Sequence, residues 1–93
     1  MDYSQELLKE IETKAEEMMT PKEISFLLNV DEIILTDDIN TIGHPARKAF
    51  FNGVSTSALQ LRENIREAAI AGSPFSIAEC QKLIMNQLSE VNV

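Results

Sequence analysis

Few residues in this chain are of the types that carry out chemistry. The 93 residues include one histidine, His44, one cysteine, Cys80, and no tryptophan. A zinc site needs about three or four Cys, His or carboxylate ligands, and a catalytic nucleophile needs a base beside it, so neither is indicated. We expect His44, beside Gly43 and Pro45, to be exposed or to cap a helix, and Cys80 to be a small buried hydrophobic side chain. No enzyme activity, cofactor or bound metal is expected.

Charge is distributed unevenly along the sequence. Residues 1–40 contain eleven acidic and three basic residues, whereas residues 41–93 contain four acidic and five basic ones. The acidic pairs Glu16-Glu17 and Asp37-Asp38 lack the alternating ligand spacing of a calcium loop, so we interpret them as solvated surface. A polyanion would be repelled by the first part of the chain and at best tolerated by the second.

Composition points to a folded, water-soluble protein. The hydrophobic fraction of 44% and the charged fraction of 25% are those of a globular chain, and we expect a single domain over residues 1–93. The lone cysteine and the absence of a signal-peptide pattern at the start favour the cytoplasm. No run approaches the roughly 20 apolar residues that cross a bilayer, so no membrane partner is expected.

The spacing of apolar residues predicts an all-α fold, a small bundle of about five helices that contains a helix-turn-helix and one long helix. The segment Ile33-Ile34-Leu35-Thr36 could be a strand, but no second strand-like run exists to pair with it, so helix is preferred. Gly53 could bend the long helix, and Gly72 is expected to end it. The predicted helices are residues 3–19, two short helices within about 20–40, the long helix at about 45–71 and the last helix at about 74–88.

Each predicted helix has an apolar face that we expect to be buried. The positions recur at spacings of three and four, as one face of a helix requires. In chain order these positions are Leu8, Ile11, Ala15 and Met18; Ile24, Leu27 and Leu28; Ile33, Ile34, Leu35 and Ile39; Ala46, Phe50, Val54, Ala58, Leu61, Ile65 and Ala68; and Ile77, Cys80, Ile84 and Leu88.

A helix-turn-helix is predicted by the segment that begins at Thr20. Thr20 can cap the free amides, Pro21 suits the first helical position, and Glu23 can reach back as a capping box. Asn29 enters the left-handed region at low cost, and Asp31 can cap the next helix. Any small helical bundle can contain such a corner, so a purely structural interpretation stays open. The residues expected to define the motif are Thr20, Pro21, Glu23, Ile24, Leu28, Asn29 and Val30.

Further segments follow the corner in a recognisable order. They are Ala49-Phe50-Phe51-Asn52-Gly53, then Leu61-Arg62, then Ala68-Ala69-Ile70-Ala71-Gly72-Ser73-Pro74 and a closing amphipathic helix. Over about residues 20–88 the chain resembles the small terminase subunits of tailed phages. The resemblance implies a DNA-recognition module from a phage or integrated element, acting in a bacterial host cell. Such subunits mark viral DNA for packaging, assemble into rings and hand the DNA to a large terminase subunit.

The second helix of the corner departs from that family pattern. It would normally offer Arg, Lys, Asn or Gln to base edges, but here it offers Asp31, Glu32, Asp37 and Asp38. Negative charge against phosphate removes the counterion-release contribution to affinity, so docking of this helix in the major groove is doubtful. Basic residues outside it are therefore the candidate DNA contacts. They are Lys22, Arg47, Lys48, Arg62 and Arg66.

Two functions stay open from the sequence. The first is a DNA-recognition component of genome packaging that binds DNA, a large terminase subunit and further copies of itself. The second is an acidic protein-interaction or oligomerisation module that does not bind DNA. In it the acidic half binds a basic partner or mimics nucleic acid, and the apolar stripe of the first or the last predicted helix forms an oligomer interface. Arg62 and Arg66 then make ordinary surface ion pairs with Glu63 and Glu67. Binding of a DNA duplex at low salt separates the two.

Overall fold

The computed structural model describes residues 1–91 and has five α-helices and no strand among them. The predicted all-α fold with one long helix is confirmed. No helix of the described residues is long and apolar enough to cross a membrane. The helices are α1 (Gln5–Glu16), α2 (Pro21–Leu28), α3 (Glu32–Ile39), α4 (Pro45–Ile70) and α5 (Pro74–Val91).

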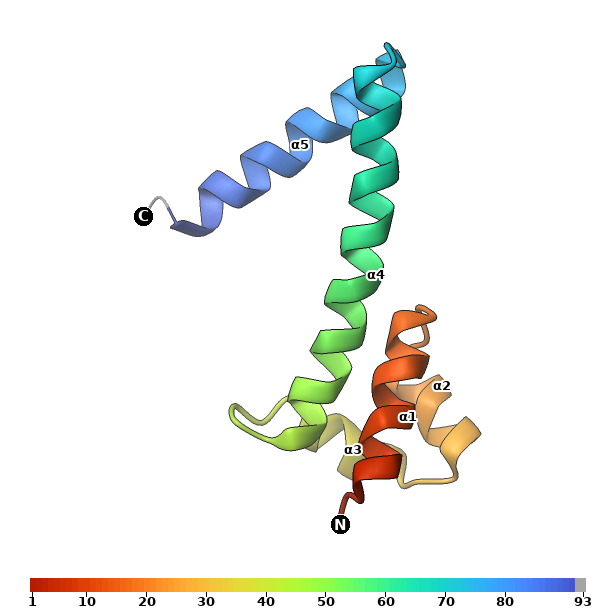
Figure 1. The fold of residues 1–93 in the computed structure, drawn as a ribbon. Helices are drawn as coiled ribbons and strands as arrows, with labels where there is room; N and C mark the ends of the chain where they lie inside the picture. Colours follow the sequence, from red (N-terminus) through yellow and green to blue (C-terminus); the bar gives the residue numbers. More distant parts are fainter. Residues whose placement is uncertain (92–93) are drawn as a thin grey trace. The chain divides into compact units, whose positions relative to one another are not determined.

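The chain divides into two compact units, and the boundary falls inside α4. The first unit is Met1–Ala58, and the second begins at Leu59. In the first unit, α1 lies beside the first part of α4, and α2 packs against α1 and α3 (Figure 1). In the second unit, α5 turns back from the end of α4 after a turn at Gly72, whose φ is +100°. The single domain expected over residues 1–93 stays a prediction.

The core of the first unit is small and draws on all four of its helices. Its buried apolar side chains are Ile11 and Ala15 of α1, Ile24 of α2, Leu35 and Ile39 of α3, and Ala46 and Ala49 of α4. Tyr3, Leu7, Leu8, Met19, Leu28, Val30 and Phe50 pack around them and are half-buried.

Helix α4 meets α1 through small residues. Its buried positions in the first unit are Ala46, Ala49, Gly53 and Ser57, which recur at spacings of three and four and so lie on one face. A Cβ atom at Gly53 would overlap the carbonyl oxygen of Glu12 and would stand 2.7 Å from the Cβ of Ala15. The backbones of α1 and α4 therefore approach each other closely at Gly53. The sequence suggested a bend at this residue, but α4 continues through it as an unbroken helix.

Several apolar residues expected to be buried in the first unit are exposed. Met18 follows the end of α1 with a φ of +69° and is 70% exposed, so α1 stops short of the predicted residue 19. Leu27, Ile33, Ile34 and Val54 are also on the surface. Each short helix contributes only one narrow stripe to a core this small, and the small residues of α4 leave Val54 outside it.

The second unit has almost no buried core. Ser76 is the only buried residue between Leu59 and Val91, the part of this unit that the structure describes. The expectation that Leu61, Ile77, Ile84 and Leu88 face inward is wrong, and Cys80 is half-buried rather than buried. Two helices cover only the stripe along which they touch, so the remaining apolar positions stay in solvent.

Candidate functional site

The corner formed by α2 and α3 is capped by the residues that the sequence predicts. Thr20 Oγ1 accepts a hydrogen bond from Glu23 N at 3.2 Å, and Glu23 Oε1 accepts one from Thr20 N at 2.9 Å, which together make a capping box. Pro21 occupies the first turn of α2. Ile24 is buried and Leu28 is half-buried, so both point toward the core.

The turn between the two helices depends on one left-handed residue. Asn29 adopts a φ of +56° and ψ of +48°, and Val30 N donates to Ser25 O at 3.0 Å. Asp31 Oδ1 then accepts a hydrogen bond from Ile34 N at 2.9 Å and caps α3. These contacts fix where α3 begins relative to α2.

The solvent face of α3 is acidic and apolar. Leu35 and Ile39 are buried one turn apart, which leaves Ile33, Ile34 and Asp37 exposed on the other side. Ile33 is 72% exposed. The face has no side chain that carries positive charge, so it attracts neither phosphate groups nor the acceptor edge of guanine.

A hydrogen-bonded cluster joins the start of the chain to α3 and to the start of α4. The hydroxyl of Tyr3 donates to Asp38 Oδ2 at 2.6 Å, and Asp38 Oδ1 lies 3.7 Å from Nε2 of His44. The rings of Tyr3 and His44 meet edge to face with centroids 5.3 Å apart. Burial, the hydrogen bond to Asp38 and the negative charge of Asp38 raise the pKa of Tyr3 well above its usual range. The cluster was not foreseen from the sequence, because its members lie far apart along the chain.

His44 is a helix cap, which is one of the two environments expected for it. Its Nδ1 accepts a hydrogen bond from Ala46 N at 3.0 Å at the beginning of α4. A nitrogen that accepts cannot carry a proton, so the proton of the neutral ring lies on Nε2, toward Asp38. His44 therefore holds the first turn of α4 against α3.

Arg47 and Lys48, both candidate DNA contacts, differ in how firmly they are held. Nη1 of Arg47 donates to the carbonyl oxygen of Ile39 at 2.9 Å, and its guanidinium lies 4.9 Å from the ring centroid of Phe51. The Arg47 side chain thus caps the C-terminal end of α3. Lys48 is exposed, and within residues 1–91 it makes no ion pair.

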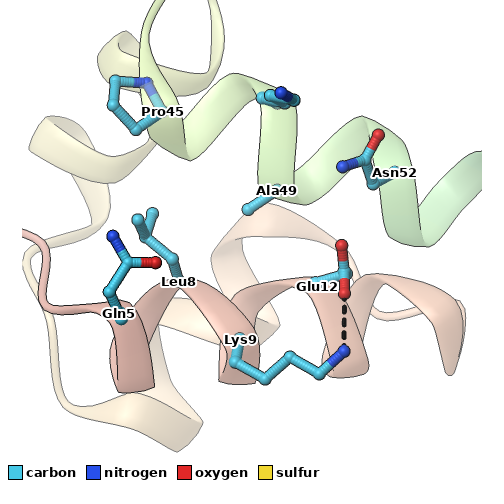
Figure 2. A pocket seen from close by; sticks show the side chains of 8 residues that line it. Gln5, Leu8, Lys9, Glu12, Pro45, Ala49 and Asn52 are labelled. Atoms are coloured by element: carbon cyan, nitrogen blue, oxygen red, sulfur yellow. Dashed lines mark hydrogen bonds and ion pairs between the residues drawn. The ribbon is translucent and has the colours of Figure 1, made fainter.

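Two surface hollows adjoin these side chains. A hollow of about 610 Å³ lies beside Arg47, Lys48 and Phe51. A second, of about 400 Å³, lies between α1 and α4 (Figure 2) and is lined by Gln5, Leu8, Lys9, Glu12, Pro45, Lys48, Ala49 and Asn52.

Lys9 and Glu12 neutralise each other in the smaller hollow. Lys9 Nζ contacts Glu12 Oε2 at 2.9 Å across one turn of α1. The hydrogen bond from Lys9 lowers the pKa of Glu12, and the same bond raises the pKa of Lys9, so both groups stay charged and paired. No cluster of three or more His, Cys, Asp or Glu side chains that could hold a metal ion occurs among the described residues.

Arg62 and Arg66 belong to the second unit, apart in sequence from the other basic candidates. With Cys80, Leu83, Ile84 and Gln87 of α5 they line a cavity of about 310 Å³. Neither arginine makes an ion pair within the described part of the chain, so the expected pairing with Glu63 and Glu67 is not formed. Lys22 is exposed on the first turn of α2, where its backbone oxygen accepts a hydrogen bond from Ser25 Oγ.

Comparison of the chain with protein-family models, with curated proteins and with solved structures found no match.

Proposed function

We propose that this chain is a non-enzymatic, self-associating helix-turn-helix protein of the terminase-small-subunit type, which binds DNA during genome packaging. One observation supports it most. A compact unit with a capped helix-turn-helix corner is followed by the end of α4 and by α5, which bury no apolar side chain between Leu59 and Val91. A recognition unit joined to an assembly unit is the organisation that a ring-forming DNA-packaging subunit needs.

The second unit supplies the argument for self-association. Isolated helices gain most of their stability from packing of an apolar face, and here the faces of α5 and of the end of α4 are in solvent. Exposed apolar patches on a folded chain are typical of protein-protein interfaces. From Leu59 onward there are four acidic and three basic residues, whereas residues 1–58 contain eleven acidic and five basic ones. Copies can therefore meet through the second unit with little charge repulsion.

DNA contact is proposed for Lys48, Arg62 and Arg66, with Lys22 and Arg47 in support. Lys48, Arg62 and Arg66 are exposed and have no acidic partner within residues 1–91. Each chain has few positive charges and a net charge of −7. In an assembly, several chains contact the same DNA duplex at once, so their combined affinity for DNA exceeds that of one chain.

A mobility-shift titration with a generic duplex at low salt tests DNA binding. Lys48→Gln should weaken binding and lower the slope of log affinity against log salt by about one per contact removed. Lys14→Gln is the matched control, because it changes net charge equally but removes a lysine that is already paired with Glu17 at 3.2 Å. Equal effects of the two variants, or no shift of the duplex at low salt, would contradict a DNA contact.

The exposed face of α3 favours a second candidate function. Its Ile33, Ile34 and Asp37 side chains suit a basic, apolar protein segment better than DNA. In that case the chain is an oligomeric protein-interaction module. Asp37→Lys separates the two functions. It strengthens DNA binding if α3 lies near the duplex, and it leaves DNA binding at zero if DNA is not a ligand.

A further inference from the structure

The hollow of about 610 Å³ at the start of α4 differs in charge from the rest of the chain. Arg47 and Lys48 line it, and none of the described residues that line it is acidic. The whole chain, in contrast, contains 15 acidic and 8 basic residues. A hollow with two cations and no carboxylate is therefore the part of the first unit that attracts an anionic ligand.

Both cationic groups of the hollow are available to a ligand. Lys48 is exposed and makes no ion pair within residues 1–91. Arg47 donates one N–H to the carbonyl oxygen of Ile39, and a guanidinium has five N–H donors, so the others stay free for a ligand. Because Ile39 and the ring of Phe51 already hold this guanidinium in place, it loses little freedom when a ligand binds.

An aromatic ring lies among these charges. Phe51 is 44% exposed, and the guanidinium of Arg47 lies over its ring, 4.9 Å from the centroid. Bases of single-stranded nucleic acids stack on aromatic rings and on guanidinium planes, and cations beside them contact the phosphates. Ser55, one turn after Phe51, adds an exposed hydroxyl group to the same hollow. The hollow thus combines a stacking surface with cations and a hydrogen-bonding group.

This surface suits an unpaired base rather than a duplex. Inside a duplex, neighbouring bases cover both faces of each base, and only its edges open into the grooves. An unpaired base has a face that is free to stack. A strand also carries one charge per nucleotide, which matches one lysine beside one stacking surface better than the clustered charges of a nucleoside triphosphate do.

We propose that the hollow binds an unpaired nucleotide of single-stranded DNA, with the base against Phe51 and Arg47 and the phosphate on Lys48. The inference rests on the DNA binding proposed above and specifies which form of DNA the first unit takes. Arg62 and Arg66 of the second unit keep their proposed contacts with the DNA backbone.

Fluorescence polarisation of a labelled oligothymidylate of about 12 nucleotides, with the full chain at low salt, tests this assignment. The strand should bind. A strand of the same length without bases should bind roughly tenfold more weakly, because stacking is lost. Equal affinity for the two strands overturns the inference, since the base then contributes nothing.

A generic duplex measured in parallel separates the two proposals. Binding of the duplex without binding of oligothymidylate overturns the inference and leaves the proposed function standing. No binding of either form overturns both. Binding of oligothymidylate alone supports the inference and contradicts the duplex contacts.

Phe51→Leu locates the base, because it removes the ring and keeps an apolar side chain. It should raise the dissociation constant for oligothymidylate roughly tenfold and leave that for the duplex nearly unchanged. Phe26→Leu is the matched control, because Phe26 is a 73% exposed phenylalanine of the first unit that does not line the hollow.

Circular dichroism checks that both variants fold, and the comparison with the base-free strand uses the unchanged protein and does not depend on them. Equal effects of Phe51→Leu and Phe26→Leu on oligothymidylate overturn the inference. An equal loss of duplex and single-strand affinity in Phe51→Leu also overturns it, because the ring then does not select an unpaired base.

Discussion

At the scale of single residues, three side chains hold separate segments of the first unit together. They are Tyr3, Asp38 and His44. Asp38 accepts from Tyr3 and lies beside His44, and His44 in turn caps α4 through Nδ1. The three side chains connect the N-terminal segment, α3 and α4 around the small apolar core. Removing one of them should weaken all three junctions.

Tyr3→Phe should lower the free energy of unfolding by about 1 kcal/mol at neutral pH, because it deletes the hydrogen bond to Asp38 in a half-buried setting. Thermal or denaturant unfolding measures the change. A variant as stable as the unchanged protein at neutral pH would mean that the Tyr3–Asp38 bond contributes nothing net.

The same bond should make stability depend on alkaline pH. The folded chain raises the pKa of Tyr3, so the stabilisation is complete below the unfolded value of about 10 and is lost as the pH rises above it toward the folded value. The unchanged protein should lose stability over this range by more than Tyr3→Phe does. Because Tyr3 is the only tyrosine, the absorbance of its phenolate gives the titration directly. Parallel losses in the two proteins would contradict the assignment.

At the scale of helices, replacing Gly53 by alanine should change stability in the opposite direction to the same replacement in an isolated helix. A glycine inside a helix costs about 1 kcal/mol relative to alanine, so Gly53→Ala would stabilise an isolated helix. Here the added Cβ would overlap the backbone of α1 at Glu12 and lie 2.7 Å from the Cβ of Ala15. Gly53→Ala should therefore destabilise the first unit by about 2 kcal/mol or more, since α1 and α4 must separate.

Ser55→Ala is the control for Gly53→Ala. Ser55 is exposed on the same helix, and alanine there should raise stability by a few tenths of a kcal/mol through helix propensity alone. Unfolding midpoints of the two variants measure the contrast. If Gly53→Ala proves as stable as Ser55→Ala, the close approach of α1 and α4 is wrong.

The sequence predicts helix boundaries well where the signal is local. The capping box of Thr20 and Glu23, the left-handed Asn29 and the stop at Gly72 each act within a few residues, and the structure has helix ends at all of them. Met18 is the exception. Its left-handed conformation follows the end of α1, but it is neither a glycine nor an asparagine, so the sequence does not predict this end.

The sequence predicts burial less well, because spacing shows which side of a helix is apolar but not what covers it. Ile84 fits a helical stripe yet is exposed, and Gly53 looked like a weak point although it lies in a contact with residues about 40 positions earlier. Arg47 looked like a free charge, but it binds the carbonyl of Ile39. The cavity lined by Arg62, Arg66 and Cys80 lies between α4 and α5, and nothing local in the sequence of either helix shows that these residues meet.

At the scale of the whole molecule, the two units differ in what stabilises them. The first unit has its own buried core of seven apolar residues, whereas the described part of the second buries none. Folding that depends on association strengthens with protein concentration, while folding that depends on an internal core does not. The two units should therefore respond differently to dilution.

Hydrogen exchange at two protein concentrations measures that difference. Dilution should speed exchange at the amides of α5, because separated copies leave its apolar sides in water and its helix marginal. Amides of α1, α2 and α3 should exchange at the same rate at both concentrations. If α5 exchanges slowly at every concentration, its stability comes from within a single chain, and the exposed sides of α5 are not what the assembly buries.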